Sequence, residues 1–108
     1  MKIGDIILIP FPFADLSNTK VRPAVLIAET QDRYKDLVVC AISSIIPKNI
    51  SKREVFLSPN RTNNLRVDSI IKIDRIVTLK HEDKIATLGE LSEMELTEFR
   101  KRFRKMIE

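Results

Sequence analysis

The sequence predicts a mainly β protein that ends in one helix. Short aliphatic and β-branched runs, each bounded by polar or turn-forming residues, recur from residue 5 to about residue 91. Such spacing is typical of an antiparallel barrel or sandwich. Residues 92–108 instead carry apolar residues at helical spacing. A chain of 108 residues has room for one modest core, so we expect a single domain, residues 1–108.

The strands follow from the apolar runs in order. Pro10 and Pro12 interrupt the first run and lack a backbone N–H, so this strand should lie at an edge or lead into a turn. Turn formers fill residues 14–20. The later runs are short and buried in character, and a polar turn at residues 80–83 divides the last β-like pieces. The predicted strands cover residues 5–13, 23–30, 36–44, 54–57 and 69–74, with further short pieces within 75–91.

The C-terminal helix has a clear start signal. Ser92 followed by Glu95 forms a capping-box pattern. Acidic residues precede basic ones along the segment, which suits the helix dipole. We interpret the basic end as a solvated face, with contact to RNA as the alternative. The apolar face predicted to pack on the sheet consists of Leu96, Phe99, Phe103, Met106 and Ile107.

Composition removes several classes of function. The chain has one histidine and one cysteine, which rules out a zinc cluster and an internal disulfide, and its two glycines do not form a phosphate loop. We predict no metal and no cofactor. Cys40 lies in an apolar run and should be a core residue, as fits a reducing cytosol, and His81 should be a surface residue. The apolar runs are too short to span a membrane, so we expect a soluble, cytoplasmic protein.

Charge favours an anionic partner. The net charge is +4, and nucleic acid is the commonest partner of a basic domain, although an inert basic surface is the alternative. Arg22 and Pro23 precede a buried run, and the proline holds residue 22 extended. Arg22 then has either an anionic ligand or a salt bridge with Asp5 or Asp15. Chemistry limited to Arg, Lys, Ser, Thr and acidic residues suits stabilisation of a phosphate transition state.

Four segments, in order, resemble the MazF/PemK family of toxin ribonucleases: "GDIILIPFPFADLSNTKVRPAVLIAE", "VVCAISS", "DSIIKIDRIVTL" and the terminal helix. The resemblance implies an SH3-like antiparallel barrel of the MazF/CcdB type, assembled as a cytosolic homodimer. It also implies a metal-independent, sequence-selective endoribonuclease. Such enzymes cut single-stranded RNA to a 2′,3′-cyclic phosphate and a 5′-hydroxyl, and a cognate antitoxin peptide blocks them.

The resemblance places the catalytic arginine on Arg22 and the catalytic hydroxyl on Ser43. Ser44 is the alternative if the register slips by one, because adjacent strand residues face opposite ways. A guanidinium can hold two phosphorane oxygens, and a hydroxyl can hold a third. Arginine gives up its proton only with difficulty, so we expect Arg22 to act through charge before it acts as an acid.

Further candidates lie in two polar connections. Many family members have a glycine and an acidic residue before the Arg-Pro pair, whereas residues 17–22 here have neither. A stiffer loop and a changed cleavage motif are expected. We favour core or dimer packing for Phe11 and Phe13, with stacking on RNA bases as the alternative. The candidate RNA-binding residues are Asn18, Thr19, Lys20, Lys48, Lys52, Arg53 and Phe11, although each basic one could equally be a plain solvated side chain.

A barrel of this kind can also bind without cutting, because fold does not fix function. Related toxins on the same scaffold act on DNA gyrase. The alternative is therefore a non-catalytic module that binds a gyrase-like protein or RNA.

Overall fold

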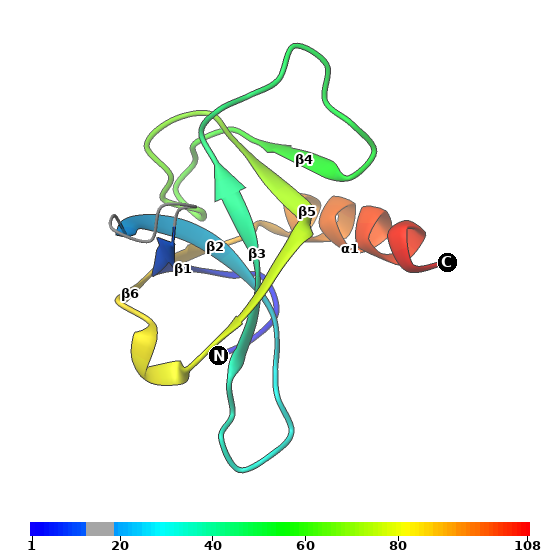
Figure 1. The fold of residues 1–108 in the computed structure, drawn as a ribbon. Helices are drawn as coiled ribbons and strands as arrows, with labels where there is room; N and C mark the ends of the chain where they lie inside the picture. Colours follow the sequence, from blue (N-terminus) through cyan, green and yellow to red (C-terminus); the bar gives the residue numbers. More distant parts are fainter. Residues whose placement is uncertain (13–18) are drawn as a thin grey trace.

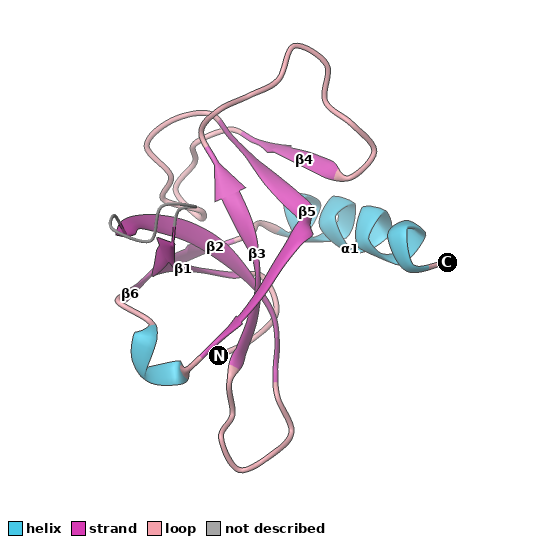
Figure 2. Cartoon of the chain, in the orientation of Figure 1, coloured by secondary structure: helices cyan, strands magenta, loops and turns pink. Residues whose placement is uncertain are grey.

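The structure, a computed structural model, describes residues 1–12 and 19–108. Its described part forms six antiparallel strands in a curled half-barrel, with one long helix packed against it at the C-terminus (Figures 1 and 2). This confirms the predicted fold class. The strands pair in the order β4-β5-β3-β2-β1-β6. The elements are β1 (Asp5–Pro12), β2 (Thr19–Glu29), β3 (Leu37–Ser43), β4 (Glu54–Leu57), β5 (Ser69–Leu79), a 3₁₀ turn η1 (His81–Asp83), β6 (Ala86–Glu90) and α1 (Glu93–Ile107).

Strand β1 lies inside the sheet, yet its two prolines lie outside the stretch that is paired on both sides. Residues Asp5 to Leu8 pair with β6, whereas residues Ile9 to Pro12 pair only with β2. Pro10 and Pro12 therefore lie where β1 has one described neighbour, and a missing N–H costs least there. The expectation of an edge position is met along half of the strand only.

Strand β5 is longer than the sequence predicted, because it bends and continues. Cys40 on β3 pairs with Ile76, but the next residue, Ala41, pairs with Lys72. Three residues of β5 therefore lie between two ladder positions that are adjacent on β3. The N–H of Ile73 turns instead to the carbonyl of Arg53, at 2.9 Å. The irregularity bends β5 across the end of the barrel.

Two hydrophobic clusters occupy the two faces of the curled sheet. Successive strand residues face opposite ways, so Ile6 and Val25 belong to one cluster while Ile7 and Leu26 belong to the other. The first cluster packs under α1 through the buried ring of Phe99. The second is enclosed by the curl of the sheet and ends at the site described below.

The helix begins as predicted. Ser92 accepts the N–H of Glu95, and Glu95 accepts the N–H of Ser92, at 3.2 and 2.8 Å. Glu95 also accepts a hydrogen bond from the buried amide of Asn63, at 3.0 Å. Across the described part of the chain, no helix is both long and apolar enough to cross a membrane.

Candidate functional site

The site lies at one end of the enclosed hydrophobic cluster. Every second residue of β1, β2 and β3 contributes to this cluster, in the runs Ile7–Ile9, Leu26–Ala24 and Leu37–Val39. Continuing each run with the period of two leads to Phe11 on β1, Arg22 on β2 and, through Ala41, Ser43 on β3. Ala24 and Ala41 are paired, so Arg22 and Ser43 follow on neighbouring strands and on the same face. Beyond the last residues of the cluster, the same face of the three strands therefore carries an aromatic ring, a guanidinium and a hydroxyl.

These three side chains line one hollow of about 240 Å³, which we call the cationic hollow. Its described lining includes three cations and no carboxylate. Such a lining favours a ligand with concentrated negative charge, such as a phosphate group. The lining residues are Phe11, Arg22, Ala41, Ile42, Ser43, Ile45, Lys72 and Arg75.

The two serines at the end of β3 face different spaces. Ser43 is half-buried and lines the cationic hollow. Its Oγ accepts the N–H of Ile45 at 3.1 Å, which leaves the hydroxyl proton able to point at a ligand. Ser44 is exposed and lines a second, more apolar hollow of about 300 Å³ with Leu8 and Pro23. Arg22 is half-buried and borders both hollows. The register favours Ser43 as the partner of Arg22, because Ser43 shares its hollow with Phe11 and Lys72.

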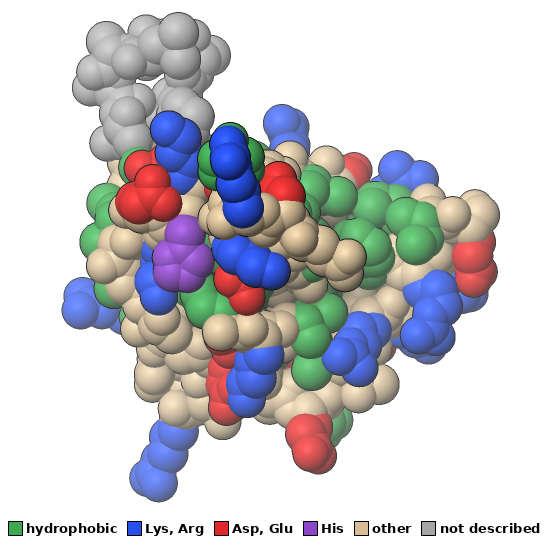
Figure 3. All heavy atoms as spheres, turned by 90° about the horizontal axis from the view of Figure 1, so that it is seen from below, with side chains coloured by type: hydrophobic (Ala, Val, Ile, Leu, Met, Phe, Trp, Pro, Cys, Tyr) green, Lys and Arg blue, Asp and Glu red, His purple; other side chains and the backbone are tan. Residues whose placement is uncertain are grey.

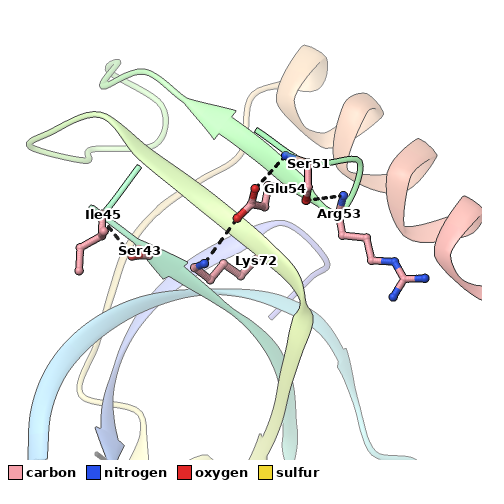
Figure 4. A network of polar contacts seen from close by, with 6 residues as sticks. All are labelled: Ser43, Ile45, Ser51, Arg53, Glu54 and Lys72. Atoms are coloured by element: carbon pink, nitrogen blue, oxygen red, sulfur yellow. Dashed lines mark hydrogen bonds and ion pairs between the residues drawn. The ribbon is translucent and has the colours of Figure 1, made fainter. Parts of the chain in front are cut away.

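Lys72 is a site residue that the sequence reasoning missed. It lies on β5 between Ala41 of β3 and Glu54 of β4, with which it pairs on either side. Figure 4 shows its side chain running toward Ser43, with the dashed contact to Glu54 at its nitrogen. The Nζ to Oε2 distance is 3.4 Å. The available signal was one charged residue between the apolar residues Ile71 and Ile73. Arg75 lies within the unpaired part of β5 and was missed too.

Glu54 fixes this arrangement from the next strand. Its Oε1 accepts the N–H of Ser51 at 2.9 Å. Hydrogen bonds from Ser51, together with the ammonium of Lys72, hold the pKa of Glu54 below its usual value. The carboxylate is therefore ionised at neutral pH and keeps Lys72 in place.

The other predicted RNA-binding residues divide into two groups. Phe11 lines the cationic hollow, and Lys20 is exposed on β2 opposite it. The backbone of Thr19 pairs with Pro12, and Asn18 lies outside the described residues.

The loop between β3 and β4 carries the remaining three. Lys48 is exposed within this loop. Lys52 and Arg53 line a different groove, against α1, and Figure 4 shows Arg53 pointing toward the helix while Lys72 points away from it. The structure therefore does not bring Lys52 and Arg53 into the cationic hollow.

The proposed salt bridge of Arg22 has no support from Asp5. Arg22 pairs with Ile9, four residues along β1 from Asp5. The carboxylate of Asp5 instead accepts the N–H of Lys2 at 3.0 Å. Asp15, the other acidic residue considered, lies outside the described residues.

Two further titratable groups were considered in the sequence. His81 is exposed in η1 and is not among the residues lining the hollow; the histidine is the purple patch in Figure 3, among interspersed charges of both signs. Cys40 is fully buried, and burial raises the pKa of its thiol to about 12. Neither side chain faces the cationic hollow. Within the described ranges, no three His, Cys, Asp or Glu side chains gather as a metal site would require.

The half-barrel and its arginine-and-hydroxyl hollow define a class of small β proteins with a cationic site for an anionic ligand. Residues 2–107 match the family described as PemK-like, MazF-like toxin of type II toxin-antitoxin system. This chain belongs to that toxin family. No curated protein sequence is similar enough to count as a match.

Solved structures share the fold at low sequence identity. The toxin MazF-mt6 of Mycobacterium tuberculosis is 16% identical over 95% of both chains, with a TM-score of 0.70. MazF of Deinococcus radiodurans is 21% identical over 99% of this chain and 96% of its own, with a TM-score of 0.70. An endoribonuclease in complex with its cognate antitoxin, from mycobacterial species, is 11% identical over 99% and 94%, with a TM-score of 0.73.

Proposed function

We propose that this toxin is an endoribonuclease that cuts single-stranded RNA at short sequence motifs and leaves a 2′,3′-cyclic phosphate and a 5′-hydroxyl. The observation that carries the proposal is the meeting of Arg22, Ser43 and Lys72 around one hollow without a carboxylate in its described lining. Family membership supports the toxin role. The structural neighbour that is an endoribonuclease supports the activity.

In this proposal the scissile phosphate sits in the cationic hollow. The 2′-oxygen of the ribose bonds to phosphorus as the bond from phosphorus to the 5′-oxygen breaks. The 2′-hydroxyl loses a proton, and the 5′-oxygen gains one. Negative charge grows on the phosphorane oxygens, where the planar fork of Arg22 holds two and the Ser43 hydroxyl donates to a third. Lys72 adds a second positive charge at the wall.

The same donor set argues for chemistry that needs no metal. Magnesium in such sites is held by carboxylate oxygens and substrate phosphates. The described lining offers no carboxylate and places three cations around the ligand, so a divalent ion would be repelled unless the RNA itself carried it. We therefore assign charge stabilisation to the side chains.

The partners follow from the same proposal. We infer that the protein acts in the cytoplasm as a homodimer and that a cognate antitoxin peptide inhibits it. The neighbour described with its cognate antitoxin supports this inference.

The test is cleavage of a long single-stranded RNA by purified protein, with and without EDTA. Discrete fragments are expected in both samples, with cyclic phosphate on the 3′ ends and a hydroxyl on the 5′ ends. Arg22→Ala protein, purified identically, controls for contaminating nuclease. If RNA of many sequences stays intact, or if EDTA stops cleavage, the proposal fails. DNA damage without loss of translation in expressing cells would favour a gyrase-like target instead.

A further inference from the structure

A second basic surface lies between α1 and the loop that joins β3 to β4. This groove of about 360 Å³, which we call the α1 groove, is separate from the cationic hollow and shares no lining residue with it. Its lining residues are Lys52, Arg53, Glu98, Lys101, Arg102, Lys105 and Met106. Five are cations and one is an anion, which gives an excess of four positive charges in a single depression.

Arg102 and Glu98 build the groove. The Nε of Arg102 donates to the carboxylate of Glu98 at 2.6 Å, and its Nη1 donates to the carbonyls of Ser51 and Glu54, each at 3.1 Å. These bonds attach the end of the loop to the helix. Glu98 is the one carboxylate in the lining, and Arg102 is its hydrogen-bonded partner. This hydrogen bond holds the pKa of Glu98 below its usual value.

The other four cations are left for a ligand. Within the described ranges, Lys52, Arg53, Lys101 and Lys105 have no side-chain hydrogen bond and no ion pair. Lys101 and Lys105 are exposed and lie one helical turn apart, about 6 Å along the axis. Only Lys101 among these four acts electrostatically on Glu98. Cations gathered in one depression repel one another, and an anionic ligand relieves that repulsion.

The lining favours a phosphate backbone over an acidic peptide. A peptide partner needs apolar pockets for its anchoring side chains, but Met106 is the one apolar residue that lines the groove. Binding of a nucleic-acid backbone needs little beyond cations spaced along the strand. Arg53 also directly precedes Glu54, whose carboxylate holds Lys72 at the cationic hollow, so one short strand separates the two basic regions.

We propose that the α1 groove is an accessory binding site for the sugar–phosphate backbone of RNA, remote from the scissile phosphate. This inference rests on the proposed ribonuclease function. It extends the RNA footprint from the open end of the barrel to the C-terminal helix. The groove adds affinity for long RNA without reading its sequence.

The test compares two double variants of the same helix. Lys101→Gln/Lys105→Gln removes two cations from the groove. Arg100→Gln/Arg104→Gln removes two exposed cations at the same spacing, from a hollow lined by Ile3 and Ile27 instead. Affinity for a long 2′-O-methyl RNA, which lacks the attacking hydroxyl, is measured against salt. The slope of log affinity against log salt concentration falls in magnitude by about 0.7 for each lost phosphate contact. The slope of the groove variant should therefore fall by about 1.4, and that of the control variant by much less.

Cleavage of a short RNA separates this proposal from the proposed function. The groove variant should cut the short RNA at the wild-type rate while it binds the long RNA more weakly. If wild-type protein neither binds nor cuts RNA, the ribonuclease proposal falls. If it cuts normally and both double variants bind long RNA alike, only the accessory site falls. Binding to polyglutamate and the mass in solution are measured for the same groove variant. If it loses polyglutamate binding but keeps its affinity for RNA, the groove is a peptide site. If its mass in solution changes, the groove is a contact between copies, and either result overturns the accessory RNA site.

Discussion

Lys72 and Glu54 lie directly opposite each other on β5 and β4, and the ammonium nitrogen stands 3.4 Å from Oε2 of the carboxylate. Both side chains are largely covered, with 33% and 13% of their surfaces exposed. A lysine on a surface loop would move through many rotamers, whereas this one is restrained at the wall of the cationic hollow. Its charge is therefore available where the proposed phosphate sits.

Substitution of Lys72 tests that role. We expect Lys72→Met to slow RNA cleavage by about tenfold, less than the ~10²–10³ lost with a direct oxyanion donor, because Glu54 already shares its charge. Lys72→Arg keeps the cation and should retain most of the activity. The measurement is the initial rate of cleavage at saturating RNA. A Lys72→Met protein as fast as wild type would remove this residue from the mechanism.

The register of β3 makes a sharper prediction. Arg22→Ala and Ser43→Ala should each lower the rate of cleavage by about 10²–10³, because each removes a preorganised donor to the phosphorane. Ser44→Ala is the matched control, since Ser44 faces the second hollow, and it should stay near the wild-type rate. Loss of activity in Ser44→Ala with Ser43→Ala active would reverse the assignment.

Asn63 should dominate the stability of the loop that lines the second hollow. Its side chain is fully buried, and it accepts from the N–H groups of Asn60 and Leu65 and donates to Ser58 and Glu95. Asn63→Ala removes all four hydrogen bonds and leaves the N–H of buried Leu65 without this acceptor. We expect the free energy of unfolding to fall by about 2–4 kcal/mol.

Urea unfolding measures this change. The control is the neighbouring exposed residue, because Thr62→Ala should alter the free energy of unfolding by less than about 0.5 kcal/mol. Equal midpoints for wild-type and Asn63→Ala protein would contradict the role of the amide.

The buried thiol predicts a dependence on alkaline pH. The folded pKa of Cys40 is raised to about 12 from the ordinary value of 9.0, mainly by burial and then by the nearby charge of Asp74. The unfolded state therefore loses this proton first. The contribution is fully present below pH 9.0 and is lost as the pH rises toward about 12.

Cys40→Ala separates this effect from the titration of lysines. Wild-type protein should lose stability more steeply than the variant over that alkaline range, as measured by urea unfolding at a series of pH values. A thiol reagent should leave folded wild-type protein unmodified at neutral pH. Rapid modification of the native protein would show that the thiol is accessible.

Local signals predicted the parts of the fold that depend on local interactions. The capping box at Ser92 and Glu95 is satisfied within one turn of helix, and the apolar runs became strands because their alternation buries one face. Strand β2 begins at Thr19, earlier than the predicted residue 23, because polar Lys20 and Arg22 gain ladder partners on β1. Propensity alone does not record such pairing.

The site required information that lies between strands. Arg22 and Ser43 could be named from the sequence, but Lys72 joins them only through the irregular pairing of β3 with β5. Lys52 and Arg53 follow Ser43 closely in the chain, yet Arg102 holds the end of their loop against the helix. Sequence distance therefore misplaced them, since a single side chain from α1 decides where the loop ends.

The enclosed hydrophobic cluster continues along its strands into Phe11, Arg22 and Ser43, which suggests how an inactive variant of the toxin could be made. Apolar replacements at positions 22 and 43 would continue the alternating apolar pattern of this cluster. Under the proposed mechanism, one substitution at either position would remove the ribonuclease activity and leave the rest of the surface unchanged. Such an inactive copy would, on the same proposal, still offer its antitoxin the surface of the intact toxin.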